Sequence, residues 1–535
     1  MNVTLPRSLF PLVAFAVSIS GCSDGAIPVP RTSTTMVEEI SLHQLSEDLA
    51  AGRTTSMTIT AAYIARIDAM DGDLNSVIAI APDALEQAAA SDGRRAQGEE
   101  FGPLDGIPIL LKDNVDALGM PTTAGSWALE RNLPSRDSEV TRRLRQAGVI
   151  ILGKANLSQF AGFRNTASFN GSTVGGSPKN PYDITRSPAG SSSGSGVATA
   201  MSFAAATIGT ETAGSIVGPS SVNGIVGMKP TIALVSRRGI VPISLNQDSS
   251  GPMTRSVRDA AMILDVIAGT DPEDPWSENA DEHLSAYTDA LDTEALQGAR
   301  VGVIRPTGQS TVQVSPLFDA ALEVLEAEGA ELVELPANAL LDPGPEMRVI
   351  LLHDFKVDLN AYLATTPDQV PVRTLDDLIA FSLTDDRERM HTMDYWDDAQ
   401  ATEDGRSHPD YVAALANGHR LTRSEGIDAL LRDFDLDVLV TPTSSPASRI
   451  EPDGTPRTGP IPPGPRRTGP PGLTVVAAVA GYPLITVPMG LVDGLPVGIT
   501  FAGTAWTEAQ LLGWAYDYEQ ASQARVPPER TLTNR

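Results

Sequence analysis

Two glycine- and serine-rich segments, SPAGSSSGSGVA (residues 187–198) and IGTETAGSIVGPSSVNGIVGMKP (residues 208–230), lie close together near the middle of this chain. The second contains the turn Thr212-Ala213-Gly214-Ser215. A catalytic serine needs a tight, glycine-permissive turn that exposes its hydroxyl and directs backbone N–H groups at a developing oxyanion. The small, apolar run between the segments, Val197 to Ile208, predicts a buried helix or helix–strand element that holds both loops rigidly.

A lysine follows an apolar run farther upstream, in GPLDGIPILLKDNVDA (residues 102–117). The pattern predicts a strand over Ile107–Leu111 that delivers Lys112. An ammonium with a pKa of about 10.4 acts as a base only if burial lowers that pKa by several units. By spacing alone, an ordinary surface lysine at the end of a strand is the better interpretation of Lys112.

Lys112, Ser191 and Ser215 together resemble the amidase signature family, whose enzymes hydrolyse carboxylic amides with a Ser, cis-Ser, Lys triad. The resemblance runs from about Val37 to the C-terminus. It includes three further segments in the family's order: GKANLSQFAGF (153–163), SSGPMTRSVRDAAMILD (249–265) and AGYPLITVPMG (480–490).

The resemblance implies an α/β fold, with a single large mixed β-sheet covered on both sides by helices. Ser215 would be the nucleophile, Ser191 a bridging serine with a cis peptide bond, and Lys112 the final base. We expect the backbone N–H groups of Thr212, Ala213, Gly214 and Ser215 to form the oxyanion hole. We expect neither a metal nor a cofactor, because the chain has no HExxH motif and no Cys/His cluster.

The turn departs from the family's common Gly-Gly-Ser-Ile-Arg, because this chain has Ala213-Gly214-Ser215-Ile216-Val217. Ala213 can still donate its N–H if its φ is not strongly positive. The long GMKPTIALVSRRGIVPIS segment (227–244) is most similar to bacterial peptide amidases, which remove C-terminal amide groups from peptides.

The expected function is therefore hydrolysis of a linear amide to an acid plus ammonia or an amine through an acyl-enzyme on Ser215, with C-terminal peptide amides among the candidate substrates. The alternatives are an esterase or substituted-amide hydrolase with the same triad, and a non-catalytic, amidase-like surface lipoprotein. The glutaminase subunit that amidates charged transfer RNA belongs to the same family, but the export signal described below disfavours that cytoplasmic role.

Other catalytic patterns fit poorly. Gly148–Lys154 matches the start of a phosphate-binding loop, but Ala155 replaces the required Ser or Thr, so a buried strand is the better interpretation. Gly190–Gly194 matches a hydrolase nucleophile elbow but follows the turn-rich NPYDITRSPA rather than a strand. None of the six histidines lies beside a serine or glycine motif.

Residues 1–22 predict an export signal, since a weakly basic start precedes an apolar stretch too short to span a bilayer. The segment ends in Ile19-Ser20-Gly21-Cys22, which resembles the lipobox of bacterial lipoproteins, with Cys22 as the lipidated residue. We expect residues 23–35 to be a tether and the protein to face the periplasm from a lipid anchor; a soluble periplasmic protein after signal cleavage is the alternative.

Residues 36–535 are expected to form a single amidase catalytic domain, within which Pro452–Gly472 is a Pro/Gly-rich surface loop. The formal net charge of −28 opposes nucleic acid and anionic membrane surfaces. The expected partner is a small-molecule or peptide amide, with membrane contact only through the N-terminal anchor. The sequence leaves the oligomeric state open.

Periodicity predicts the remaining elements. Helices are expected within 36–71, 82–90, 316–329, 348–389 and 502–522, and strands at 299–305, 436–441 and 484–487.

Overall fold

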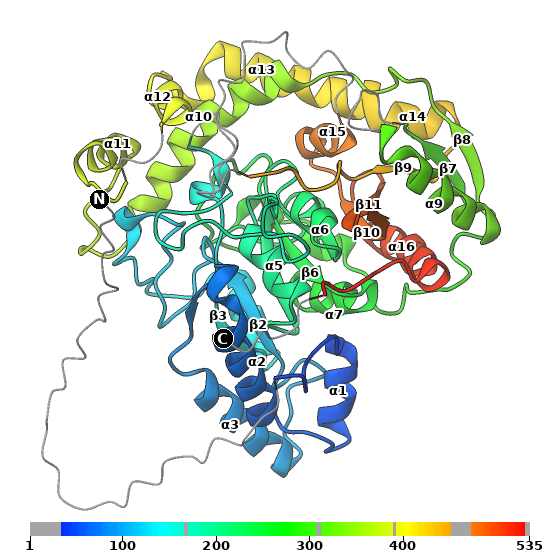
Figure 1. The fold of residues 1–535 in the computed structure, drawn as a ribbon. Coiled ribbons are helices and arrows are strands. Elements are labelled where there is room, and N and C mark those ends of the chain that lie inside the picture. The colour runs from blue at the N-terminus through cyan, green and yellow to red at the C-terminus, as the bar shows by residue number, and fades with distance from the viewer. Residues whose placement is uncertain (1–33, 165–169, 306–311, 389–391, 451–471, 530–535) are drawn as a thin grey trace, which may run out of the picture.

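The computed structural model describes residues 34–164, 170–305, 312–388, 392–450 and 472–529 (Figure 1). The predicted export signal with Cys22 lies outside the described residues. So do the predicted tether, apart from residues 34 and 35, and the predicted loop 452–472, apart from Gly472.

All eleven strands of the described residues hydrogen-bond into one mixed sheet, in the order β1-β3-β2-β4-β6-β5-β10-β11-β9-β7-β8. The strands are β1 Val77–Ile80, β2 Pro108–Lys112, β3 Ile150–Ala155, β4 Ala206–Glu211, β5 Val226–Lys229, β6 Ser249–Thr254, β7 Arg300–Val303, β8 Glu331–Glu334, β9 Val438–Pro442, β10 Leu484–Val492 and β11 Leu495–Ala502.

The sheet centre is buried on both faces. Every residue of β2, β3 and β4 is buried, in keeping with their near-continuous apolar sequences. These three strands run parallel to one another, so their carboxyl ends meet at one edge of the sheet. That edge carries Lys112 and the turn after Glu211.

Helices cover both sides of the sheet (Figure 1). They are α1 Leu42–Ala50, α2 Ser56–Met70, α3 Ala84–Gln97, α4 Glu139–Gln146, α5 Ser193–Ala200, α6 Val217–Val222, α7 Val257–Ile267, α9 Ser315–Ala327, α10 Gly344–Leu363, α11 Leu375–Thr384, α12 Asp394–Gln400, α13 Pro409–Thr422, α14 Asp428–Asp433, α15 Leu473–Ala480 and α16 Glu508–Ser522.

Helix α5 is the element predicted between the two serine-rich loops. It is built from small residues, all of them buried, and it packs against β2 and β4. Small side chains let a helix backbone approach a sheet closely, so α5 fixes the positions of both loops that flank it.

Helices α10, α12 and α13 pack together in the arch at the top of Figure 1. A separate apolar cluster joins this arch to the loop after β3, through Phe160 and Phe163 on the loop and Phe355 and Trp396 on the helices. Phe160 meets Trp396 edge-on, with ring centroids 5.1 Å apart. The arch is therefore attached to a loop at the carboxyl edge of the sheet.

The fold prediction is confirmed, and so are the individual elements that the sequence indicated. The segment Gly148–Lys154, which matches the start of a phosphate-binding loop, contains most of the buried strand β3, and the prediction of a buried strand there is confirmed. Within the described residues, no helix combines the length and apolar character needed to span a membrane.

Candidate active site

Parallel pairing of β2 with β4 brings the predicted lysine to the predicted serine loops. Leu111 is in register with Ile208, so Lys112 lies beside the end of β4. The Lys112 side chain is fully buried. Its Nζ donates hydrogen bonds to Ser191 Oγ at 2.7 Å, to Thr210 Oγ1 at 2.8 Å and to the Thr210 carbonyl oxygen at 3.1 Å.

The three oxygen atoms that contact the Lys112 amine are all uncharged. Burial lowers the pKa of Lys112 to about 7, although the negative charges of Asp248 and Glu211 act in the opposite direction. Desolvation wins because neither carboxylate forms an ion pair with the amine within the described residues. A sizeable fraction of the amine is therefore neutral near pH 7.

Ser191 follows the cis peptide bond Gly190–Ser191, as the family resemblance implied. The Ser191 carbonyl accepts a hydrogen bond from Ser158 N at 2.9 Å. Gly190 has no room for a side chain, because a Cβ there would lie 2.3 Å from Ser158 Oγ and 2.9 Å from Asn170 Oδ1. Close packing around Gly190 thus holds the Ser191 hydroxyl over the lysine.

The turn Thr212–Ser215 leaves β4 and enters α6. Gly214 adopts φ +89°. Ala213 is not among the residues with positive φ, so it meets the requirement stated above for an Ala213 N–H that donates to an oxyanion. Within the described part of the chain, none of the N–H groups of residues 212–215 donates a hydrogen bond. Ala213, Gly214 and Ser215 are only half-buried. These four N–H groups therefore have no acceptor within the described part of the chain, and Thr212 is the one of the four residues that is buried.

Two carboxylates hold this turn. Glu211 Oε2 accepts hydrogen bonds from Ile216 N at 2.7 Å and Val217 N at 3.0 Å, directly after Ser215. Asp248 accepts a 2.5 Å hydrogen bond from Thr212 Oγ1. Val217, which stands where the family commonly has arginine, is fully buried in the apolar cluster that contains Leu473.

The two serine hydroxyls are not hydrogen-bonded to each other in the described structure. Their loops are joined instead through the backbone, where Ser192 N donates to the Ser215 carbonyl at 3.2 Å. Catalytic hydrogen bonds in unliganded enzymes are often long and tighten only when substrate binds.

A family model named Amidase matches residues 58–512. The chain belongs to the amidase signature family. The Arabidopsis thaliana protein named "Probable amidase" is 35% identical over 519 residues, which cover 94% of each chain.

Among solved structures, the native peptide amidase from Stenotrophomonas maltophilia is 43% identical, with a TM-score of 0.84 over 92% of this chain and 98% of that one. An amidase family protein from Bacillus anthracis is 29% identical, with a TM-score of 0.80 over 93% of this chain and 94% of that one. Family membership and the likeness to peptide amidase make the chain a hydrolase of carbon–nitrogen amide bonds.

The amidase site contains a second buried lysine that the sequence did not assign. Lys154 Nζ lies 3.2 Å from Asp113 Oδ1 and donates to the Val115 carbonyl at 2.7 Å. Asp113, next to Lys112 in sequence, therefore pairs with Lys154 and not with Lys112. The sequence signal for this separation is the alternation of side chains along β2. Neighbouring residues of a strand point to opposite faces, so Lys112 and Asp113 are expected to point apart.

Sequence reasoning also missed the loop beside Ser191. Phe160, Ala161 and Gly162 all have positive φ, and a Cβ on Gly162 would lie 3.9 Å from Ser191 Cβ. Strained backbone of this kind persists only where its surroundings enforce it. Glu388 holds both ends of this loop: it is fully buried and accepts hydrogen bonds from five donors, namely Ser126 Oγ, Trp127 N, Gln159 Nε2, Arg164 Nη1 and Thr173 Oγ1.

Side chains of the types that bind metal ions are scattered through the fold. Across the described ranges, no group of three His, Cys, Asp or Glu side chains is placed to hold a metal ion.

Proposed function

We propose that this amidase removes C-terminal amide groups from peptides, releasing ammonia, through an acyl-enzyme on Ser215. The observation that carries the proposal is the 2.7 Å hydrogen bond from a buried, readily deprotonated Lys112 to Ser191, beside a turn whose four N–H groups have no acceptor among the described residues. A buried amine base next to two serines has no purpose in a purely structural scaffold.

The relay starts with Lys112 as the neutral amine, which has two N–H donors and one lone pair, so across the 2.7 Å contact the Ser191 hydroxyl now donates to Nζ. Ser215 Oγ bonds to the amide carbon while its proton passes to Ser191 Oγ, and the Ser191 proton passes to Lys112 Nζ. The carbonyl oxygen becomes an oxyanion held by the N–H groups of the 212–215 turn. When the C–N bond breaks, the proton returns through Ser191 to the leaving nitrogen, and ammonia departs.

Water then completes the cycle. It bonds to the acyl carbon, loses a proton to Lys112 through Ser191, and expels Ser215, which recovers that proton. The products are the peptide acid and ammonia, and the enzyme returns to its starting protonation state.

The peptide part of the proposal rests on the likeness to peptide amidase, at 43% identity over 92% of this chain. It is tested by ammonia release from C-terminally amidated peptides and from simple aliphatic and aromatic amides, with Ser215→Ala in parallel. Release from the peptide amides that is lost in the variant supports it. Release from simple amides alone keeps the mechanism and rejects the peptide substrate. Faster cleavage of matched esters would favour an esterase.

We further propose that the protein is exported and anchored through a lipid on Cys22, because the only cysteine directly follows an apolar signal-like segment. Expressed in a Gram-negative host, the full chain should partition into detergent on Triton X-114 phase separation. Cys22→Ser should move to the aqueous phase. Equal partitioning of both chains would contradict the anchor.

A further inference from the structure

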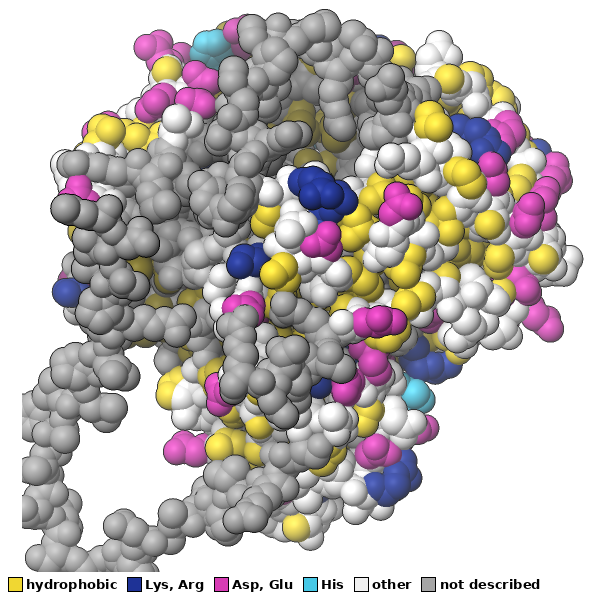
Figure 2. All heavy atoms as spheres, in the orientation of Figure 1, with side chains coloured by type: hydrophobic (Ala, Val, Ile, Leu, Met, Phe, Trp, Pro, Cys, Tyr) yellow, Lys and Arg dark blue, Asp and Glu magenta, His cyan; other side chains and the backbone are white. Residues whose placement is uncertain are grey.

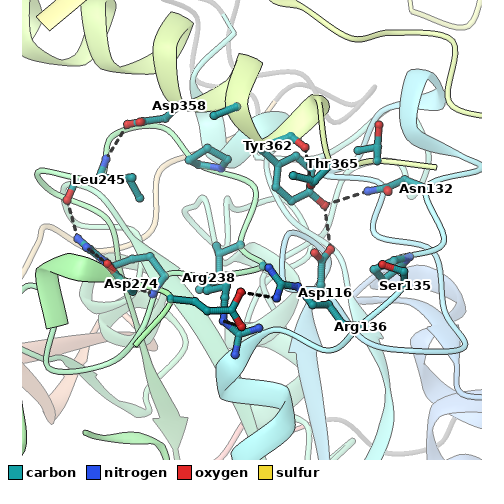
Figure 3. A pocket seen from close by; sticks show the side chains of 18 of the residues that line it. Asp116, Asn132, Ser135, Arg136, Arg238, Leu245, Asp274, Asp358, Tyr362 and Thr365 are labelled. Atoms are coloured by element: carbon teal, nitrogen blue, oxygen red, sulfur yellow. Dashed lines mark hydrogen bonds and ion pairs between the residues drawn. The ribbon is translucent and has the colours of Figure 1, made fainter. Parts of the chain in front are cut away.

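A pocket of about 320 Å³ opens between α10 and three loops, and Lys112, Ser191 and Ser215 are not among its walls (Figure 3). Its lining includes the apolar side chains of Ile240, Pro242 and Trp276. Its lining also includes a polar cluster: Figure 3 shows the Asp116 carboxyl and the Asn132 amide converging on the Tyr362 hydroxyl. The pocket therefore suits a small molecule with one apolar and one polar end.

The charges on the pocket wall are matched with one exception. The ion pairs are Arg136 with Glu273 at 2.5 Å, Arg237 with Asp274 at 2.7 Å, Arg238 with Asp271 at 2.8 Å and Asp358 with Arg406 at 2.6 Å. The exception is Asp116, which forms no ion pair with any Lys or Arg of the described residues. It is the only carboxyl on this wall that lacks a cationic partner there.

Asp116 is 8% exposed, and the Tyr362 hydroxyl donates to its Oδ1 at 2.8 Å. Hydrogen bonds from Tyr362 and Thr122 and the charge of Lys154 lower its pKa, whereas the charge of Asp113 raises it. The Lys154 ammonium is already bonded to Asp113, Val115 and Thr122. Burial nevertheless raises the pKa of Asp116 to about 6, so the carboxyl is ionised at pH 8, and no described Lys or Arg forms a direct ion pair with it.

We propose that this pocket binds a small primary amine as its ammonium ion, with the charge at Asp116 and the carbon skeleton against Ile240, Pro242 and Trp276. An ammonium supplies the counter-charge and the N–H donors that the carboxyl lacks. Primary amines belong to the class of leaving groups that amide hydrolysis releases. Arg237 and Ile240 line both this pocket and a neighbouring cavity of about 10 Å³, which Thr210 and Thr212 also line. These two side chains therefore separate the pocket from the cavity beside the predicted catalytic turn.

Calorimetric titration of the wild-type chain with benzylamine tests the proposal, with benzyl alcohol as the neutral isostere. At about pH 8 the amine should bind at least about tenfold more tightly than the alcohol, because a hydrogen bond between charged groups is worth more than a neutral one. The preference should fade below about pH 6, where Asp116 takes up a proton. Equal affinities, or no binding of benzylamine, would overturn the proposal.

Asp116→Asn tests whether the amine binds in this pocket. The substitution removes the negative charge but keeps an oxygen that can accept the hydrogen bond from Tyr362. The variant should bind benzylamine about tenfold more weakly or worse. Glu273→Gln is the matched control: it removes a carboxylate from the same pocket that already has an arginine partner, and should change the affinity less than about threefold. Unchanged affinity in Asp116→Asn would place the amine elsewhere and reject the site. If that variant does not fold, the alcohol comparison and the pH series decide.

Discussion

At the scale of single residues, the protonation of Lys112 is decided by what its amine touches. All three hydrogen-bond acceptors of Nζ are neutral oxygens, and the two carboxylates that act on it do so at longer range. A full hydrogen-bonded ion pair would restore the ammonium, as it does for buried lysines in general. Asp113, the next residue in the chain, pairs with Lys154 instead.

The first prediction concerns pH. If neutral Lys112 is the base, kcat/KM for amide hydrolysis should fall about tenfold per pH unit on the acidic side of about pH 7, since the lysine is then protonated. Removing the nearby negative charge with Asp248→Asn should move this limb to lower pH, because that charge raises the pKa of Lys112. The exposed Asp319→Asn should leave the limb in place. A flat profile from about pH 5.5 to 8.5 would argue against lysine as the base.

The second prediction compares two glycines. Gly190→Ala drives a Cβ to within 2.3 Å of Ser158 Oγ and displaces the loop that carries Ser191. We expect a loss of about 1–3 kcal/mol in the free energy of unfolding and at least about a tenfold drop in kcat/KM.

Gly218→Ala is the control, because a Cβ at Gly218 meets nothing within 4 Å and the residue lies in helix α6. It should be neutral or slightly stabilising. Urea unfolding and ammonia release measure both variants. Equal behaviour of the two would show that the packing at Gly190 is unimportant.

At the scale of elements, strand direction assembles the site. Strands β2 and β4 are parallel neighbours, so residues 98 positions apart in the chain, Lys112 and Thr210, meet at one edge of the sheet. Helix α5 then returns the chain from Ser191 to β4. The loop of residues 160–162 is placed by different means, through Glu388, which lies after helix α11 in the chain.

The third prediction tests this link. Burial alone would raise the pKa of Glu388, but the hydrogen bonds from Arg164 and Gln159 lower it below its usual value. Glu388→Gln leaves the buried Arg164 without its counter-charge and should destabilise the fold by about 3–5 kcal/mol. Denaturant unfolding gives this value.

The matched control is Asp398→Asn, which breaks an ion pair between two half-exposed side chains, Arg348 and Asp398. An exposed pair contributes about 1 kcal/mol or less. Similar losses in both variants would mean that Glu388 is not a special anchor. Because its pKa is lowered on folding, the stabilisation by Glu388 should be present above about pH 4.5 and should disappear as the pH falls further.

At the scale of the whole molecule, excess negative charge opposes a compact fold. The formal net charge is −28, and acidic side chains are distributed over the face drawn in Figure 2. Surface ion pairs such as Arg305–Asp319 and Arg420–Glu425 offset little of this repulsion, since exposed pairs are individually weak.

The fourth prediction follows from that balance. Added NaCl should raise the melting temperature, because screening relieves the net repulsion more than it weakens the surface pairs. Most of the gain should appear below about 0.15 M, the ionic strength at which the Debye length has shortened to about 8 Å. Thermal scans in NaCl and KCl at matched ionic strength measure it, and agreement between the salts identifies screening as the cause. A falling melting temperature would mean that attractive surface pairs dominate.

The sequence by itself determined the fold class, the order of the main elements and the candidate catalytic residues Lys112, Ser191 and Ser215. The fold class and these three residues follow from the resemblance to the amidase signature family. Local patterns predict the elements: apolar runs for buried strands, small residues for α5, and glycine where a turn needs it. Only the tertiary structure decided which charged groups are neighbours. Asp113 pairs with Lys154, Glu388 anchors a distant loop, and Asp116 lines a pocket without forming an ion pair to any described residue. Such contacts join residues far apart in the chain and follow from sheet register and packing, so no local sequence pattern encodes them.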